Sequence, residues 1–248
     1  MKETKINIAP AVTQATEEAL EEMYIAIREK EGRIYTDKQV ARLPDIDKGH
    51  RFYKEWIIRQ RSSQRLVTYL AAMHRPLNIL EIGCGNGWLS AKLAGIPHAK
   101  VTGLDPNRIE IEQARRVFKR PNLQFIQKGF DHDTFEGKVK FDIIIFAASL
   151  QYFPSVRVVI ANAFALLTEQ GKVHILDTPF YNVQQADIAA QRCRKYYEDM
   201  GFQGMAENYF HHTMNKIQAF KHRVLFDPRG LWNRIVKKDV FYWIVLKP

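Results

Sequence analysis

Apolar positions in the first 75 residues recur at helical spacing. Within residues 20–27 they lie three or four apart in a run rich in Glu and Ala, and Gly32 stands where a helix would end. The same spacing returns across residues 52–74, interrupted by the polar run 59–65. The pattern predicts a first amphipathic helix, a connector over residues 33–49, and a second helix that is either continuous or two helices joined.

After Pro76 the pattern changes to short apolar runs that alternate with helical stretches. This alternation is typical of a parallel sheet that helices cover on both faces. The predicted strands are residues 78–82, 100–104, 123–127, 141–146 and 172–176. The connecting helices are expected to begin near Trp88, Pro106 and Pro154, because proline is well tolerated in a first helical turn.

The last third of the chain adds a helix, an insertion and a hairpin. A helix is predicted from Val183 to Met200, closed by Gly201, and residues 202–218 exceed what a simple crossover needs. Residues 221–227 and 240–246 are β-rich, and turn residues begin the connection between them. The expected fold is α/β, with a doubly wound Rossmann-like sheet of about seven strands, mostly parallel with an antiparallel terminal hairpin. Residues 1–75 would form an N-terminal helical cap or lid, and residues 76–248 the core.

Composition narrows the class of protein. The 248 residues are 46% apolar and 26% charged, as in an ordinary folded domain, which excludes a disordered or low-complexity chain. The longest mostly apolar stretch, residues 143–150, is far shorter than the roughly 20 residues that a membrane-spanning helix needs. The N-terminus lacks the apolar core of a secretory signal, so we expect a cytoplasmic protein in which Cys84 and Cys193 are free thiols.

The net charge of +10 raises the question of nucleic-acid binding. The excess is divided between two segments, with +5 in residues 50–75 and +5 in residues 181–248, whereas residues 76–180 carry only +2. This distribution indicates a nearly neutral core flanked by basic accessory segments.

A glycine-rich turn follows the first predicted strand of the sheet and precedes a helix, with glycines at positions 83, 85 and 87. An open α/β sheet binds adenosine-containing ligands at this place, and glycine lets a ligand approach the backbone without meeting a Cβ atom. A dinucleotide fingerprint would require glycine at position 88, which is Trp. Glu81 precedes the turn and would repel a phosphate but attract an ammonium group, so a cationic ligand is favoured.

A second carboxylate, Asp105, stands at the end of the next predicted strand. There it is placed to accept hydrogen bonds from both hydroxyls of a ribose. Alternatively, it caps the helix that begins beside Pro106. The presence of Glu81 and the glycine turn nearby favours the ribose interpretation.

These motifs resemble those of the class I S-adenosylmethionine-dependent methyltransferases. The resemblance rests on Glu-Ile-Gly-Cys-Gly-Asn-Gly at residues 81–87, on Asp105 and on residues 141–149, and it covers roughly residues 76–180. It implies an S-adenosylmethionine cofactor over the carboxyl ends of the strands and a reaction that needs no metal. The implied cofactor-binding residues are Glu81, Gly83, Cys84, Gly85, Asn86 and Gly87 at the methionine part, Asp105 and Pro106 at the ribose, Gly129, Phe130 and Asp131 at the adenine, and Ala147 and Ala148 on the far side.

The adenine contact departs from the family pattern. The family often has an acidic residue directly after the turn glycine, whereas this chain has Phe130 there and Asp131 one place later. Either Phe130 stacks on the adenine or Asp131 reaches its amino group.

The methyl acceptor is less defined by the sequence. If its nucleophile carries a proton, a base assists, and the polar candidates are Tyr152, His50 and the pair His211–His212. The candidates for lining the substrate pocket are Tyr53, Trp56, Arg59 and Tyr209.

The basic and aromatic residues of segments 50–65 and 202–218 allow two interpretations. They fit RNA recognition, or they belong to helices that dock on the sheet with their charges in solvent. No recognised RNA-binding motif is present. We therefore expect a methyltransferase that acts on a small or medium-sized molecule, and the alternatives are an RNA methyltransferase and a non-catalytic S-adenosylmethionine-binding protein.

Overall fold

The computed structural model describes residues 14–135, 139–231, 233 and 239–248. It divides the chain into two compact units, residues 1–34 and residues 35–248. The first unit contains helix α1 (Gln14–Lys30), and Gly32 beyond it adopts the left-handed conformation (φ 71°) that ends many helices. None of the helices within the described ranges is both long enough and apolar enough to span a lipid bilayer.

A seven-stranded sheet forms the centre of the second unit. Its strands are β1 (Leu77–Ile82), β2 (Ala99–Asp105), β3 (Leu123–Gln127), β4 (Phe141–Ala147), β5 (Leu167–Leu176), β6 (Lys221–Phe226) and β7 (Trp243–Lys247). They lie in the order β3-β2-β1-β4-β5-β7-β6. Strands β1 to β5 are parallel, whereas β7 runs antiparallel to β5 and β6. The predicted sheet, including its antiparallel terminal hairpin, is therefore confirmed.

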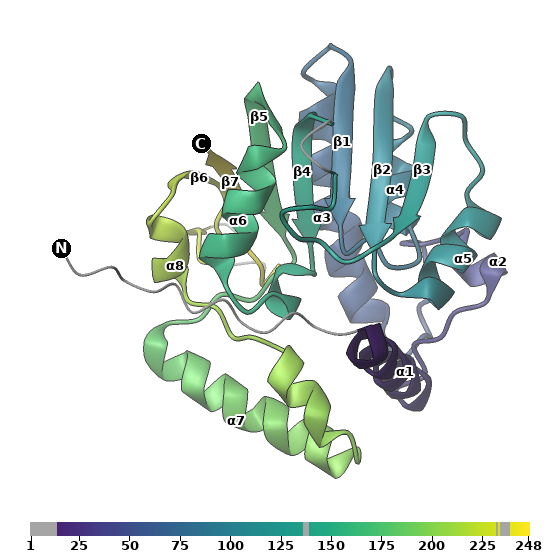
Figure 1. Ribbon diagram of the computed structural model, residues 1–248, viewed down its shortest axis with the longest axis vertical. Helices are drawn as coiled ribbons and strands as arrows, with labels where there is room; N and C mark the ends of the chain where they lie inside the picture. The colour runs from purple at the N-terminus through teal and green to yellow at the C-terminus, as the bar shows by residue number, and fades with distance from the viewer. Residues whose placement is uncertain (1–13, 136–138, 232, 234–238) are drawn as a thin grey trace. The chain divides into compact units, whose positions relative to one another are not determined.

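Helices cover both faces of this sheet (Figure 1). They are α2 (Asp37–Val40), α3 (Tyr53–Ala71), α4 (Trp88–Leu93), α5 (Arg108–Val117), α6 (Val156–Ala165), α7 (Val183–Asp199) and α8 (Met214–Gln218), with 3₁₀ turns η1 (Leu150–Tyr152) and η2 (Gln203–Asn208). Helices α3 and α4 pack on one face, and α6 and α8 pack on the other. Because both faces are covered, the central strands are apolar along almost their whole length, as in β4.

The boundary between the two units differs from the one expected from the sequence. The expected helical cap ends at residue 75, but the structure divides the chain after Ile34. Helix α3 is a single helix whose residues Trp56, Leu66 and Leu70 are buried in the same core as β1 and α4. Tyr35 and the α2 region belong to this core as well. The apolar stripe of α3 is thus part of the sheet's own hydrophobic core, so residues 35–75 are not a separate cap.

The expected insertion crosses the carboxyl ends of two central strands. In Figure 1, α7 lies beyond the arrowheads of the strands, and the chain then returns towards the sheet. On this return, the Phe210 amide donates a hydrogen bond to the Gln151 carbonyl (2.7 Å), and the Tyr181 amide donates one to the His212 carbonyl (3.0 Å). Gln151 follows β4 and Tyr181 follows β5, so residues 209–213, which we call the strap, are tied to the loops after both strands.

Candidate functional site

The glycine turn leads from β1 into α4 with a backbone that only glycine adopts readily. Gly83 and Gly87 have φ values of 74° and 76°, in the left-handed region. A Cβ atom on Gly83 would collide with the Cβ atom of Ser149, which follows β4. The Gly85 amide donates a hydrogen bond to Asp105 Oδ2 (2.8 Å). The ends of β1, β2 and β4 therefore meet around this turn.

Three carboxyl groups surround the turn. Glu81 is 2% exposed, and its Oε2 accepts a hydrogen bond from the Ser90 hydroxyl (2.5 Å). Burial raises the pKa of Glu81 to about 8, the Ser90 hydrogen bond opposes this rise, and the charge of Asp105 adds to it. Glu110, on the first turn of α5, places its carboxylate 3.1 Å from where a Cβ atom on Gly85 would lie. The turn is therefore an acidic cradle that suits a cationic ligand.

Asp105 does not cap α5, which settles the alternative left open by the sequence. Asn107 is the N-cap residue, since its side chain accepts a hydrogen bond from the Glu110 amide (2.9 Å). Asp105 instead accepts hydrogen bonds from the Gly85 and Asn107 amides. It is 9% exposed, whereas Pro106 beside it is exposed. Asp105 thus links the end of β2 to the glycine turn, where the ribose-binding carboxylate was expected.

The groups on this turn fit the methionine part of S-adenosylmethionine. The Asn86 side-chain oxygen is buried and has no hydrogen-bond partner among the residues that the structure describes, so an ammonium donor would satisfy it. Asp105 and Glu110 supply negative charge, and an ammonium group next to Glu81 would favour the charged form of its carboxyl group. The buried thiol of Cys84 packs in a cluster with Ile111 and Phe125. Only the backbone of Cys84 belongs to the cradle.

The expected adenine and far-side residues occupy the loops after β3 and β4. Apart from the chain neighbours of Gly129, none of the described residues has a heavy atom within 4 Å of where a Cβ atom on Gly129 would stand. The Phe130 ring packs edge-on against Phe146 at 6.3 Å between centroids, and the Asp131 carboxylate accepts a hydrogen bond from Thr134. Ala147 ends β4, and Ala148 has φ 55°. These contacts hold the Phe130 ring at the sheet and tie the Asp131 side chain to its own loop.

Two of the expected acceptor-side residues, Tyr152 and Tyr209, lie together at the strap, and Arg59 lies close to them. The rings of Tyr152 and Tyr209 pack edge-on at 5.6 Å between centroids. Burial raises the pKa of Tyr209. The neighbouring Tyr152 and Tyr181 add to this rise, and the positive charge of Arg59 opposes it. Arg59 is itself paired with Glu55 (2.9 Å). The carboxyl edge of β4 and β5 therefore carries a cluster of phenols near an arginine.

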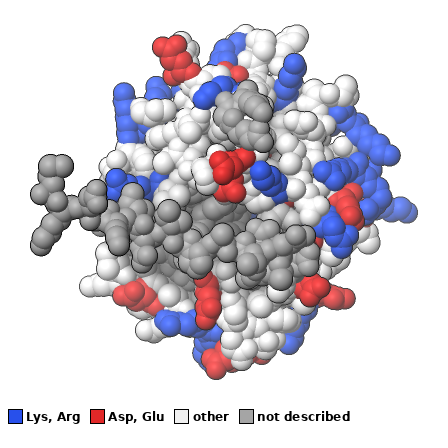
Figure 2. Space-filling model, viewed as in Figure 1, with Lys and Arg blue, Asp and Glu red and all other residues white. Residues whose placement is uncertain are grey.

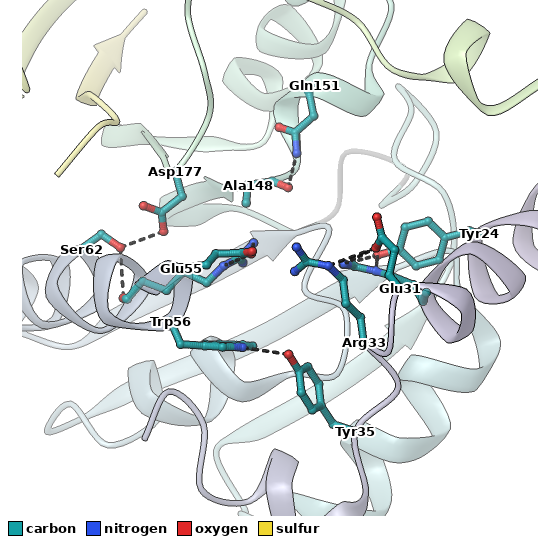
Figure 3. A network of polar contacts seen from close by, with 12 residues as sticks. Tyr24, Glu31, Arg33, Tyr35, Glu55, Trp56, Ser62, Ala148, Gln151 and Asp177 are labelled. Atoms are coloured by element: carbon teal, nitrogen blue, oxygen red, sulfur yellow. Dashed lines mark hydrogen bonds and ion pairs between the residues drawn. The ribbon is translucent and has the colours of Figure 1, made fainter. Parts of the chain in front are cut away.

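The other expected acceptor residues lie elsewhere. Trp56 is only 5% exposed, and its indole N–H donates a hydrogen bond to the Tyr35 hydroxyl (2.9 Å), so it belongs to the core and cannot line a pocket (Figure 3). Tyr53 is the half-buried first residue of α3. His50 accepts a hydrogen bond from the Phe52 amide (3.1 Å) in the loop before α3.

The pair His211–His212 is divided between two environments. His212 is fully buried, bonded to the Leu150 carbonyl (3.2 Å), and burial lowers its pKa to about 4. His211 is half-buried between the rings of Tyr181 and Tyr209. His212 therefore anchors the strap, and His211 faces the phenol cluster.

Sequence reasoning missed two carboxylates, Glu110 and Asp177. Glu110 stands three residues after the N-cap Asn107, a spacing that places it on the first turn of α5 next to the glycine turn. Asp177 directly follows β5, at the same edge as Asp105, and this position after a predicted strand was a readable signal. Asp177 is 8% exposed and accepts a hydrogen bond from Ser62 (2.8 Å; Figure 3).

Comparison with known proteins places this geometry in a family. The family described as a methyltransferase domain matches residues 79–171. Malonyl-[acyl-carrier protein] O-methyltransferase 1 of Ilyobacter polytropus is 26% identical over 52% of this chain and 48% of its own length. The chain spans about half the length of the curated relatives that it matches first.

Solved structures share the fold over nearly the whole chain. Magnesium protoporphyrin IX methyltransferase from Synechocystis PCC 6803, solved with S-adenosylhomocysteine (SAH), superposes with a TM-score of 0.56 at 17% identity, over 91% of this chain and 97% of its own. The plantazolicin methyltransferase in complex with SAH gives a TM-score of 0.55 at 12% identity, over 94% and 98%. Residues 79–171 thus match a methyltransferase domain, and the chain shares its fold with solved S-adenosylmethionine-dependent methyltransferases.

Proposed function

We propose that this protein transfers the methyl group of S-adenosylmethionine to a small or medium-sized acceptor molecule. The observation that carries the proposal is the acidic cradle of Glu81, Asp105 and Glu110 around the glycine turn. The cofactor supplies an already activated sulfonium methyl group. The protein has to bind the cofactor, orient the acceptor in line with the carbon–sulfur bond and exclude water, and positioning of this kind supplies up to about 7–11 kcal/mol in favourable cases.

Different residues would bind the different parts of the cofactor. Glu81 and the Asn86 side-chain oxygen would hold the ammonium group, and Asp105 would accept the ribose hydroxyls. Gly83 lets the glycine turn pass close to Ser149, where a Cβ atom would collide. Phe130 or Asp131 would contact the adenine. The relatives include a malonyl-[acyl-carrier protein] O-methyltransferase, which supports a non-nucleic-acid acceptor.

The positive charge near α3 gives little support to an RNA acceptor. Arg59 is paired with Glu55, and Arg61 and Arg65 are paired with Asp239 at 3.6 and 2.7 Å. The pairs with Asp239 tie α3 to the segment before β7, and together the pairs offset part of the charge of the helix. Figure 2 shows Lys and Arg around the rim of this view with Asp and Glu between them, and they gather most on the right, on the side of β3 and α5.

Calorimetry of cofactor binding tests the first half of the proposal. Asp105→Ala should weaken S-adenosylmethionine binding at least tenfold, since each hydrogen bond to a carboxylate contributes about 1.5–3 kcal/mol. Asp142→Asn is the matched control, because Asp142 pairs with Arg75 (2.8 Å) at the start of β4, the opposite edge of the sheet. Circular dichroism should confirm that both variants are folded. Unchanged affinity in a folded Asp105→Ala variant would remove Asp105 from the site.

Formation of SAH tests the second half. The protein should form it from S-adenosylmethionine in the presence of the small-molecule fraction of a cell extract. Product that appears only with the RNA fraction, and disappears after ribonuclease treatment, would support an RNA methyltransferase. Tight cofactor binding without product in any fraction would indicate a non-catalytic binding protein.

A further inference from the structure

Two residues with left-handed backbone stand side by side at the carboxyl edge of the sheet. Ala148 after β4 has φ 55°, and Asp177 after β5 has φ 52°. The Ala148 amide donates a hydrogen bond to the carbonyl of Leu176 (3.0 Å), so the two strained residues are neighbours. Strain of this kind persists where the surrounding structure enforces it, and it concentrates at functional sites.

Asp177 is a buried carboxyl group with charges of both signs around it. Its Oδ2 accepts a hydrogen bond from the Ser62 hydroxyl of α3 (2.8 Å; Figure 3). Burial raises the pKa of Asp177 to about 6. This rise is opposed by Arg59, Ser62 and Arg65 of α3, whereas the charge of Asp239 before β7 adds to it. This carboxyl group therefore titrates close to neutral pH, in the range that suits a base.

The position of Asp177 relates it to both halves of the site. Ser149, directly after Ala148, donates a hydrogen bond to the carbonyl of Ile82 (2.6 Å) and lies against Gly83. The loop after β4 thus separates the glycine turn from Asp177. On the other side, the charge of Arg59 lowers the pKa of both Asp177 and Tyr209, so the same guanidinium acts on Asp177 and on the phenol cluster.

We propose that Asp177 is the base that takes the proton from the methyl acceptor, and that the acceptor group is therefore a hydroxyl or an amine N–H and not a carboxylate. This inference rests on the proposed function. The acceptor proton passes to Asp177, the acceptor oxygen or nitrogen forms a bond to the methyl carbon, and the bond from that carbon to sulfur breaks with its electron pair left on sulfur. A carboxylate acceptor has no proton to give, and next to Asp177 it would meet a like charge, since Arg59 is already paired with Glu55.

The first test measures the protonation of Asp177 without cofactor or acceptor. In protein labelled with ¹³C at the aspartate side-chain carboxyl carbon, one resonance should titrate near pH 6 and be missing in Asp177→Asn. Ser62→Ala removes a hydrogen bond that favours the charged form, so it should shift this titration to higher pH. Asp142→Asn is the control, since Asp142 pairs with Arg75 at the opposite edge of the sheet, and it should keep the resonance in place. A resonance of Asp177 that titrates near pH 4 would overturn the proposal.

The second test follows the methyl group. The protein is incubated with S-adenosylmethionine that carries a radioactive methyl group and with the small-molecule fraction of a cell extract. The labelled product should resist mild alkali, which hydrolyses methyl esters but not ethers or methylamines. Asp177→Asn should lose at least about 100-fold in rate while its affinity for SAH stays within twofold. Ser62→Ala should move the lower limb of the pH–rate profile to higher pH, and Asp142→Asn should leave that limb in place.

The outcomes separate this inference from the function on which it rests. Label released as methanol, or an Asp177→Asn variant with the wild-type rate, would overturn the role of Asp177 while the methyltransferase activity stands. No labelled product with the wild-type protein would contradict the proposed function and this inference with it.

Discussion

Replacing Glu81 with Gln should make the protein without cofactor more stable at neutral pH and weaken its binding of S-adenosylmethionine. Glu81 is fully buried, and its pKa is raised from 4.5 to about 8. In the unfolded chain this carboxyl is ionised at pH 7, so folding must either bury the charge or take up a proton. With 1.36 kcal/mol for each pKa unit, the cost at pH 7 is about 3 kcal/mol.

Because folding raises the pKa of Glu81, its contribution to the free energy of unfolding depends on pH in a defined direction. A carboxyl whose pKa is raised on folding contributes its full stability below the unfolded pKa, near 4.5, and this contribution is lost as the pH rises towards 8. Glutamine carries no charge at any of these pH values. The free energy of unfolding of Glu81→Gln relative to the wild type should therefore increase by roughly 3 kcal/mol between pH 5 and pH 7.5.

Urea unfolding at these two pH values, with cofactor affinity measured in parallel, checks the reasoning. If Glu81 binds the ammonium group, Glu81→Gln should lose about 10- to 100-fold in affinity for S-adenosylmethionine. Adenosine lacks the methionine part and serves as the control ligand, with unchanged affinity. A stability difference that is the same at both pH values would refute the reasoning about burial, and equal loss of affinity for adenosine would refute the assignment of the ammonium contact.

Three further predictions concern the core, the unit boundary and nucleic acid. Trp56→Ala should destabilise the protein by about 3–5 kcal/mol in thermal unfolding, and Trp56→Phe by much less, because the deleted ring is buried; a small loss in the Ala variant would contradict the core assignment. Deletion of residues 1–34 should leave a cooperatively folded protein that binds SAH. Deletion of residues 1–49 also removes the buried Tyr35 and should lower the melting temperature. Non-cooperative melting after the shorter deletion would contradict the division of the chain after Ile34. Binding to transfer RNA should be weak and decline steeply with salt, and submicromolar affinity at physiological salt would overturn the preference for a small acceptor.

The sheet could be predicted from the sequence because its signals are local. Apolar runs such as residues 141–146 match β4 to within one residue, and Gly201 adopts the left-handed conformation (φ 79°) just after α7. The glycine turn was recognisable because it needs particular residues at fixed positions. Asp105 was placed at the edge of the sheet for the same reason, since the end of a parallel strand defines where its side chain lies.

The pattern of α3 left two interpretations open, RNA recognition and docking on the sheet, and the structure shows the docked helix. The pattern could not decide between them, because which face of an amphipathic helix is buried, and against what, depends on partners far away in the chain. Asp239 pairs with Arg61 and Arg65, and Tyr35 accepts the indole hydrogen bond of Trp56. Because these contacts join residues far apart in the sequence, the local pattern of α3 cannot predict them. The same holds for Asp177, whose burial depends on α3.

The two halves of the site come from different parts of the chain, and this has a consequence for how such a protein diversifies. The carboxylates and glycines of the cradle lie between residues 81 and 110, whereas Asp177 and the strap lie after residue 171, where the family match ends. The segment from Asp177 to the start of β6 begins and ends at strands that do not pair with each other, since β7 lies between β5 and β6. Its length is therefore not constrained by sheet register. Insertions and exchanges there would alter which molecules are methylated while leaving the machinery for the shared cofactor intact, so sequence similarity across the family reports the donor far better than the acceptor.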